Sequence, residues 1–504
     1  MANFKEIPVS PDQLLMFPVS VDASIPQGSD VRVLGEAMDM LDWSVFESGY
    51  SQTGCPAYPP KVLAKVLVYG YSKGIRSSRA LEDAVKNDKR YIWLAGGLEP
   101  DHTTISRFRK HKQAELKAAY KETVRICAEA GLVLLNVTAT DGSKILARAS
   151  RRSLYDSARL ERESEAIEAI IREAEEVDAE EDARYGSAAA SAVPEELADA
   201  RKRKKKLEEA AARLKQDRQK RISVTDPECR VMKTSMGLRP AYNVQLTVDS
   251  ANQVIVAADV VTNQADNGQL PNQLQQVAEN TGLRPDHVLA DTGYSDEATF
   301  KALEEMGQDA LIPPCQQPQE RKRKDLFASK CFGKAEGKDA LICPAGRELP
   351  FYRQVKCSSG AYKEYRAFGC RDCSFYAQCV MTHCKTGRAV QVSVVADQRQ
   401  AMLDRLATSE GRELYALRQQ IVEPTFGNIK SNMKLDRFLL DGKAGASSET
   451  WLMCMAHNLK IYIKKAANPA RSLLRVCATG KTWYRAITVR AFRGLSLRKV
   501  CCSA

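Results

Sequence analysis

Four stretches of the chain have the composition of short β-strands. Apolar and β-branched residues dominate 135–141, 242–249, 254–261 and 288–291, as is typical of strands with at least one buried face. Residues 250–252 are small or polar and suit a hairpin turn between the second and third stretches. The pattern predicts a sheet whose strands come from distant parts of the chain.

Other segments have helical spacing. Residues 61–71 are strongly apolar with lysines on one side, which is typical of a core helix, and a further helix is expected from about 269 to 280. Residues 101–111 begin with Asp101, a plausible helix cap, and residues 415–430 also have a helical pattern. The region before the first strand is therefore expected to be helical.

Three acidic residues stand where these elements would direct a carboxylate at a metal ion. Asp141 closes the first strand, Asp291 closes the last, and Glu423 lies in the helix 415–430. Divalent cations with phosphate ligands prefer oxygen donors, so carboxylates from two strand ends and one helix form the skeleton of a two-metal phosphoryl-transfer site. Taken singly, each acid has another interpretation, since Asp before Gly is common in turns and a helical Glu is usually solvated.

The sequence motifs around these acids resemble those of the DDE transposases of bacterial insertion sequences. They comprise Thr140-Asp141-Gly142-Ser143-Lys144, Ala290-Asp291-Thr292-Gly293-Tyr294, and Tyr415 and Arg418 ahead of Glu423, with Lys430 seven residues after it. The match is closest to the group of the fourth insertion-sequence superfamily with a cysteine-rich insert before the last acid. It extends from about Pro60 to about Lys465.

The resemblance implies an α/β fold with a ribonuclease-H-like catalytic core, a mixed sheet flanked by helices. It implies that Asp141, Asp291 and Glu423 hold Mg²⁺ or Mn²⁺ as catalytic acids. Lys430 lies two helical turns beyond Glu423, where its ammonium group could hold a DNA phosphate beside the metals. Pro424 lacks an amide donor and disfavours a helical Glu423, so the helix is expected to start or kink there.

Residues 101–111 also suggest a DNA-binding helix, because small hydroxyl residues and cations suit phosphate and base-edge contacts in a major groove. The alternative is a helical support domain with a charged outer face. The resemblance extends to this region and favours binding of double-stranded DNA, at transposon ends and target. The candidate DNA-binding residues are Arg76, Arg79, His102, Thr103, Thr104, Arg107, Arg109, Lys110, Tyr415, Arg418 and Lys430.

A charged insertion separates the first strand from the others. An acidic section carries Leu160, Ile167, Ile170, Ala174 and Val177 at heptad-like spacing, and a basic section carries Leu207 and Leu214 one heptad apart. An antiparallel helical hairpin, with the acidic arm against the basic arm, accounts for both sections. Direct contact of the basic arm with DNA is the alternative.

Cysteines cluster between the second and third acids. Cys370 and Cys373 form a CxxC knuckle, which supplies two ligands of a tetrahedral zinc. Cys343 and Cys379 best match the insert of the resembled family as the other two ligands, with Cys384 and Cys357 as rivals. The alternative is a set of reduced, unligated cysteines. The expected role of a zinc is structural.

Composition agrees with a nucleic-acid enzyme. The 504 residues allow several domains, 44% are apolar, and the net charge of +12 favours a polyanionic partner. No signal peptide or apolar run of membrane-spanning length is found, so no membrane partner and a bacterial cytoplasmic, nucleoid-associated location are expected. The expected domains are a helical N-terminal DNA-binding domain (1–134), a catalytic domain in three parts (135–150, 222–315, 395–465), the helical insertion (151–221), the zinc-binding insertion (316–394) and a basic tail (466–504).

The function that follows is a transposase that cleaves DNA at transposon ends and transfers the 3′-OH ends to target DNA. A homodimer in a synaptic complex is expected by analogy. Two alternatives remain open, a metal-dependent endonuclease of the same fold without strand transfer and a catalytically inactive DNA-binding protein.

Overall fold

The computed structural model describes residues 20–48, 50, 56–185, 195–314, 327, 329–357, 360–380 and 387–466. The chain divides into two compact units, Met1–Ile463 and Lys464–Ala504. All elements below lie in the first unit, except the end of the last helix. Residues 467–504 of the expected basic tail, and Cys384, lie outside the described residues.

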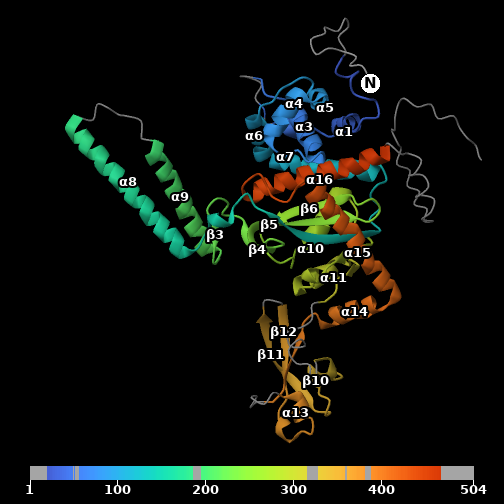
Figure 1. The fold of residues 1–504 in the computed structure, drawn as a ribbon. Helices are drawn as coiled ribbons and strands as arrows, with labels where there is room; N and C mark the ends of the chain where they lie inside the picture. Colours follow the sequence, from blue (N-terminus) through green and yellow to red (C-terminus); the bar gives the residue numbers. More distant parts are fainter. Residues whose placement is uncertain are drawn as a thin grey trace, which may run out of the picture. The chain divides into compact units, whose positions relative to one another are not determined.

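A mixed sheet forms the centre of the first unit (Figure 1). Strand β5 pairs antiparallel with β1 on one side and with β4 and β6 on the other, and β7 and β8 continue from β1 in parallel. The strands are β1 (Val137–Leu146), β4 (Arg230–Thr234), β5 (Gly237–Asp249), β6 (Ile255–Val261), β7 (His287–Ala290) and β8 (Ala310–Leu311). The four strands predicted from the apolar pattern are all present.

Strand β1 is longer than predicted. The prediction that Asp141 closes the strand is wrong, because the residues from Asp141 to Leu146 continue to pair with β5 in unbroken register. Asp291 follows the last residue of β7, as predicted. One catalytic candidate therefore lies inside a strand and the other at a strand end.

Helices cover the sheet. The N-terminal region is helical, as predicted, and its core is continuous with that of the sheet. Figure 1 shows α7 and α16 next to the sheet, where Tyr120 of α7 and Asn458 of α16 both donate hydrogen bonds to the Ile255 carbonyl of β6. The helices are α1 (Asp30–Asp39), α2 (Ser44–Glu47), α3 (Pro60–Ser72), α4 (Ser78–Asn87), α5 (Lys89–Ala95), α6 (His102–His111), α7 (Gln113–Glu129), α10 (Leu270–Thr281), α11 (Glu297–Met306) and α16 (Gly442–Ala466).

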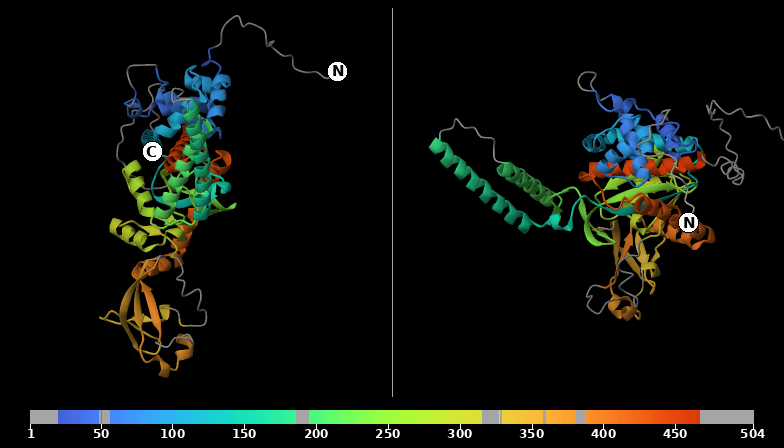
Figure 2. Two further views of the ribbon diagram at one scale, coloured as in Figure 1. Left: turned by 90° about the vertical axis from the view of Figure 1, so that its left-hand side faces the viewer. Right: turned by 45° about the horizontal axis from the view of Figure 1, so that its top comes forward.

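The charged insertion contains α8 (Ser157–Tyr185) and α9 (Glu195–Gln216), which lie side by side (Figure 2). Three ion pairs join the acidic arm to the basic arm, Glu163–Arg203, Glu168–Lys204 and Glu175–Arg201. The short strands β2 (Leu154–Tyr155) and β3 (Ile222–Ser223) close its base.

Leucines and isoleucines at the base form the apolar core of this hairpin. Leu160, Ile167, Leu207 and Leu214 are buried there. The heptad stripe does not continue outward, since Ile170 and Val177 are 55% and 51% exposed. The predicted hairpin is confirmed, and among its described side chains the apolar seam extends from the base to Ile171 and Ala200.

The cysteine-rich insertion is a small antiparallel sheet in the order β13-β12-β11-β10-β9. Its elements are β9 (Gly333–Lys334), β10 (Ala340–Ile342), β11 (Glu348–Cys357), β12 (Gly360–Arg366), the short helix α13 (Tyr376–Cys379) and β13 (Ala389–Ser393). Phe332, Leu349, Tyr365 and Val390 belong to its own separate core. The insertion is therefore a distinct module.

Two helices, α14 (Ala396–Ala407) and α15 (Ser409–Gly427), lead back to the central sheet. The helix does not start at Glu423, because α15 runs through Pro424, and a π-helical segment, Asn428–Asn432, follows it. Pro424 cannot donate to the Gln420 carbonyl four residues earlier. The Gln253 side chain donates to that carbonyl at 3.2 Å instead.

Candidate active site

The register of β1 and β7 brings two aspartates together. Thr140 is aligned with Ala290 in this parallel pair, so Asp141 and Asp291 come next at the same level on adjacent strands. The Arg418 guanidinium lies 3.0 Å from the Asp141 carboxylate and 3.8 Å from that of Asp291. Both carboxylates therefore share one cation.

Burial dominates the electrostatics of Asp141. It raises the pKa of Asp141 to about 6, because the charged carboxylate is partly withdrawn from water. Arg418 opposes this rise, whereas the negative charges of Asp291 and Asp266 add to it. Asp141 thus lies in a cluster of acids that a positive charge stabilises.

Helix α15 supplies the residues above the two aspartates. Burial raises the pKa of Tyr415, and Arg418, Asp291 and Asp141 also act on its hydroxyl. Burial lowers the pKa of Lys430, which the charge of Asp141 partly offsets. Tyr415 and Arg418 of α15, and Lys430 of the π-helical segment that follows it, therefore lie near the aspartates.

Glu423 has a different environment. It is exposed on α15, between Arg418 and Lys430 in sequence, and makes no side-chain hydrogen bond or ion pair with the described part of the chain. Within that part, no three His, Cys, Asp or Glu side chains are grouped as a metal site. The structure brings Asp141 and Asp291 together, and Glu423 lies on the helix that packs over them.

Asp266 lies in the loop between β6 and α10. It does not cap α10, whose N-cap is Gln269. Its carboxylate accepts hydrogen bonds from Lys144, Asn243 and Gln245. The apolar pattern did not single out Asn243 and Gln245, although polar residues at alternate positions of a buried strand are a signal for such a network.

Helix α6 exposes part of the predicted DNA-binding set. The Asp101 carboxylate caps it by accepting from the Thr104 amide at 2.8 Å, as predicted. Thr103, Arg107 and Lys110 are exposed. Arg79 on α4 is also exposed, whereas His102 and Thr104 are half-buried and engaged with Glu82 and Asp101. Thr103, Arg107 and Lys110 are free to meet a ligand.

Two predicted DNA contacts are directed inward instead. Arg76 is 7% exposed and Arg109 is 3% exposed. Arg76 donates to the Glu449 carboxylate at 2.7 Å, and Arg109 donates to the Tyr71 hydroxyl and the Arg76 carbonyl. Because both guanidinium groups are buried and bonded within the protein, we no longer assign Arg76 and Arg109 to DNA binding.

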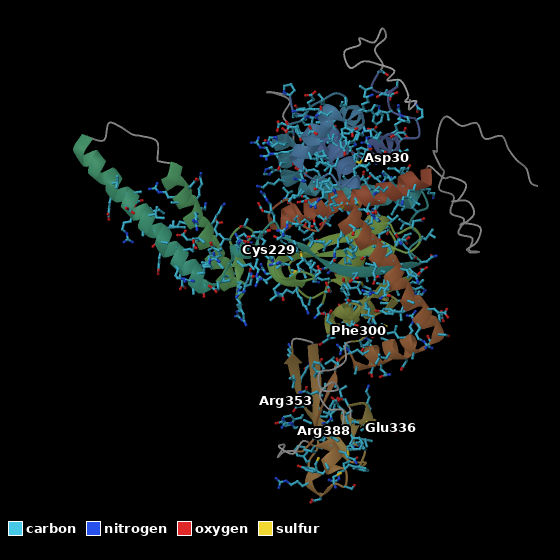
Figure 3. The ribbon with its side chains drawn as sticks, viewed as in Figure 1. Asp30, Cys229, Phe300, Glu336, Arg353 and Arg388 are labelled. Carbon is cyan, nitrogen blue, oxygen red and sulfur yellow. The ribbon has the colours of Figure 1, made fainter. Side chains whose placement is uncertain are left out.

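The four predicted zinc ligands line one pocket in the insertion. Cys343, Cys370, Cys373 and Cys379 line it together with aromatic residues and Arg388, which Figure 3 labels in this module. Burial raises the pKa of Cys379, an effect that Arg388 opposes and the other three cysteines reinforce. The four cysteines thus share one pocket, although they are not drawn together into a formed metal site within the described residues, and zinc binding stays a prediction.

Comparison with protein families assigns both ends of the described chain. A family described as a transposase domain (DUF772) matches residues 19–111, and a family described as a transposase DDE domain matches residues 342–463. The second match contains Glu423 and the four cysteines, whereas Asp141 and Asp291 lie outside both matches. The protein is therefore a transposase. More particularly, it belongs to the DDE transposases of insertion sequences.

Comparisons with individual proteins add little. No curated protein matches the chain. Among solved structures, the cryo-EM structure of the piggyBac transposase synaptic complex with hairpin DNA is similar at 8% identity and a TM-score of 0.32, over 88% of this chain and 75% of that chain. None of the described helices is long and apolar enough to cross a membrane.

Proposed function

We propose that this transposase cuts DNA at the ends of its element and joins the 3′-OH ends to target DNA at a site formed by Asp141, Asp291 and Glu423. The observation that carries the proposal is the placement of Asp141 and Asp291 at one level of adjacent parallel strands, beneath Arg418 of α15. The strand order β6-β5-β1-β7-β8, with its first three strands antiparallel and its last two parallel to β1, supports a ribonuclease-H-like core.

The donor set fits divalent metal. The carboxylates of Asp141 and Asp291 are hard oxygen ligands, and both already lie against a positive charge. Glu423 would complete the set from α15. When bound, Mg²⁺ or Mn²⁺ would activate the attacking water or 3′-hydroxyl and stabilise the leaving oxygen. Once the carboxylates have another cation, Arg418 is free to hold a DNA phosphate, with Lys430 beside it.

Cations outside the acid site would hold double-stranded DNA. Arg79, Thr103, Arg107 and Lys110 present donors on the exposed surfaces of α4 and α6, and such side chains contact phosphates and base edges. Two ends must be brought together for joining, so we propose that the protein works as a homodimer.

The cysteine pocket would hold a structural zinc ion. A bound zinc would cross-link the cysteines around the module's small core. We therefore expect about one zinc per purified chain. Cys373→Ser should lower the zinc content to near zero by atomic absorption, whereas Cys229→Ser, a buried thiol outside the module, should leave it unchanged. Equal zinc in both variants would remove Cys373 from the ligand set.

The decisive experiment incubates the purified full-length chain with Mg²⁺, DNA duplexes from the regions flanking its own gene, and a target plasmid. We expect nicks at defined positions and products in which the cut 3′ end is joined to plasmid. Nicks without joined products would favour an endonuclease, and binding without nicks would favour an inactive DNA-binding protein. Nicking and joining by Asp141→Asn at the wild-type level would overturn the proposed site.

A further inference from the structure

Asp266 occupies a half-buried position behind the acid site. It follows β6 in the loop before α10, and its side chain is 16% exposed. Its carboxylate accepts hydrogen bonds from Asn243 and Gln245 at 2.7 Å each and from Lys144 at 3.1 Å. Three donors from two strands therefore hold this one loop residue in a fixed place.

The same carboxylate touches the backbone beside both catalytic aspartates. A Cβ atom on Gly142 would lie 2.3 Å from one Asp266 oxygen, and a Cβ atom on Gly293 would lie 3.4 Å from the other. Any side chain at Gly142 would displace Asp266. The absence of a side chain directly after Asp141 thus lets the Asp266 carboxylate approach β1, while its other oxygen lies at contact distance from the Gly293 position.

A hydrogen-bond chain reinforces this bridge. The Gln245 amide donates to Asp266, and its carbonyl oxygen accepts from the buried Tyr294 hydroxyl. Tyr294 belongs to the short turn that follows Asp291. The chain therefore links strand β5, the Asp266 loop and the turn that carries the second aspartate.

Asp266 lies on the opposite face of the sheet from the Asp141 carboxylate. Successive side chains of a strand point to opposite faces. Gly142 is aligned with Gln245, and both belong to the face that carries Asp266. Asp141, one residue earlier, points to the other face, where it meets Arg418. Asp266 already accepts hydrogen bonds from three donors, and strand β1 lies between its carboxylate and that of Asp141. Asp266 therefore supports the site and is not a fourth metal ligand.

We infer that Asp266 is a positioning residue that sets the spacing of Asp141 and Asp291 from behind the sheet, and so determines how well the two carboxylates share metal. The inference rests on the proposed metal site. Groups that orient metal ligands without touching the ion typically change metal affinity by about 10–100-fold when they are removed.

The test measures Mn²⁺ binding to the full-length chain by the EPR signal of free Mn²⁺, without DNA. Asp266→Asn should weaken binding at least about tenfold. The matched control is Asp296→Asn, because Asp296 holds the same loop through the Gly268 amide at 2.8 Å but accepts its other hydrogen bonds from Thr299 and not from β1 or β5. Its binding should stay within about twofold of wild type. In the cleavage assay, excess Mg²⁺ should restore Asp266→Asn but not Asp141→Asn.

A milder variant keeps the test valid if Asp266→Asn does not fold, as judged by circular dichroism. Tyr294→Phe removes one hydroxyl from the chain and should weaken Mn²⁺ binding roughly threefold. Wild-type binding in the folded Asp266→Asn variant, or in Tyr294→Phe when Asp266→Asn does not fold, would overturn the positioning role alone. No Mn²⁺ binding by the wild-type chain would overturn the metal site and, with it, this inference.

Discussion

The acid site and helix α6 are both rich in charged residues, but their side chains are placed by different forces. In the sheet, the pairing of Thr140 with Ala290 fixes the neighbours of Asp141 and Asp291. In α6, Arg107 is exposed, whereas Arg109, two positions later, is 3% exposed. Strand pairing determines contacts directly, while the role of a helical cation depends on what packs against the helix.

The largest expected effect is a loss of DNA cleavage without a loss of DNA binding. Asp141→Asn, Asp291→Asn and Glu423→Gln should each reduce DNA cleavage by about 1000-fold or more, because each removes a proposed metal ligand. DNA binding, followed by gel shift, should remain. Glu413→Gln, at another exposed glutamate of α15, is the control for Glu423 and should cleave normally. Cleavage within about tenfold of wild type would remove that acid from the site.

A substitution in the buried part of the N-terminal region should lower the stability of the protein and leave the chemistry of DNA cleavage unaffected. Arg76 pairs with Glu449, which is 0% exposed and also accepts from the Leu439 and Leu440 amides. Arg76→Met leaves that carboxylate buried without its cation and should lower the free energy of unfolding by about 3–5 kcal/mol. Arg79→Met, at an exposed arginine nearby, should change it by less than about 0.5 kcal/mol in the same urea titration. Equal stability of the two variants would contradict the buried ion pair.

These regions also show what the sequence predicts and what it does not. Apolar runs predicted the four strands. The cations around Glu423 were singled out by the family resemblance, and one of them, Arg418, lies against Asp141. Burial of Arg109 was not predictable, because its partner Tyr71 lies on another helix. Where α15 continues through Pro424, the carbonyl of Gln420 accepts from Gln253, a residue from a distant turn that no local pattern indicates. Local patterns thus predict elements, whereas contacts between elements decide the orientation of single side chains.

The raised pKa of Asp141 predicts a pH-dependent stability in buffer without divalent metal. A carboxyl whose pKa is raised by folding favours the native state below its ordinary pKa of about 4 and loses this contribution as pH rises through about 6. The difference corresponds to about 3 kcal/mol. Asp141→Asn should therefore be more stable than wild type at pH 8, and the gain should shrink toward pH 5.

The measurement is urea unfolding of both proteins at several pH values. Asp441→Asn is the control for the loss of an aspartate at the surface, because Asp441 is 47% accessible and paired with Arg148. A gain from Asp141→Asn that is the same at pH 5 and pH 8 would contradict a charge buried in the acid cluster.

The smallest effect concerns the exposed face of α6. Arg107→Ala and Lys110→Ala should each reduce the dependence of DNA affinity on salt by about one phosphate contact, because each cation displaces roughly one counterion from DNA. Arg125→Ala is the matched control, since Arg125 on α7 is paired with Glu122 and Glu129. The readout is the slope of log affinity against log salt concentration for a duplex from the region flanking the gene. An unchanged slope in both α6 variants would show that α6 belongs to a helical support domain. The exposed Arg107 would then have no role in DNA binding.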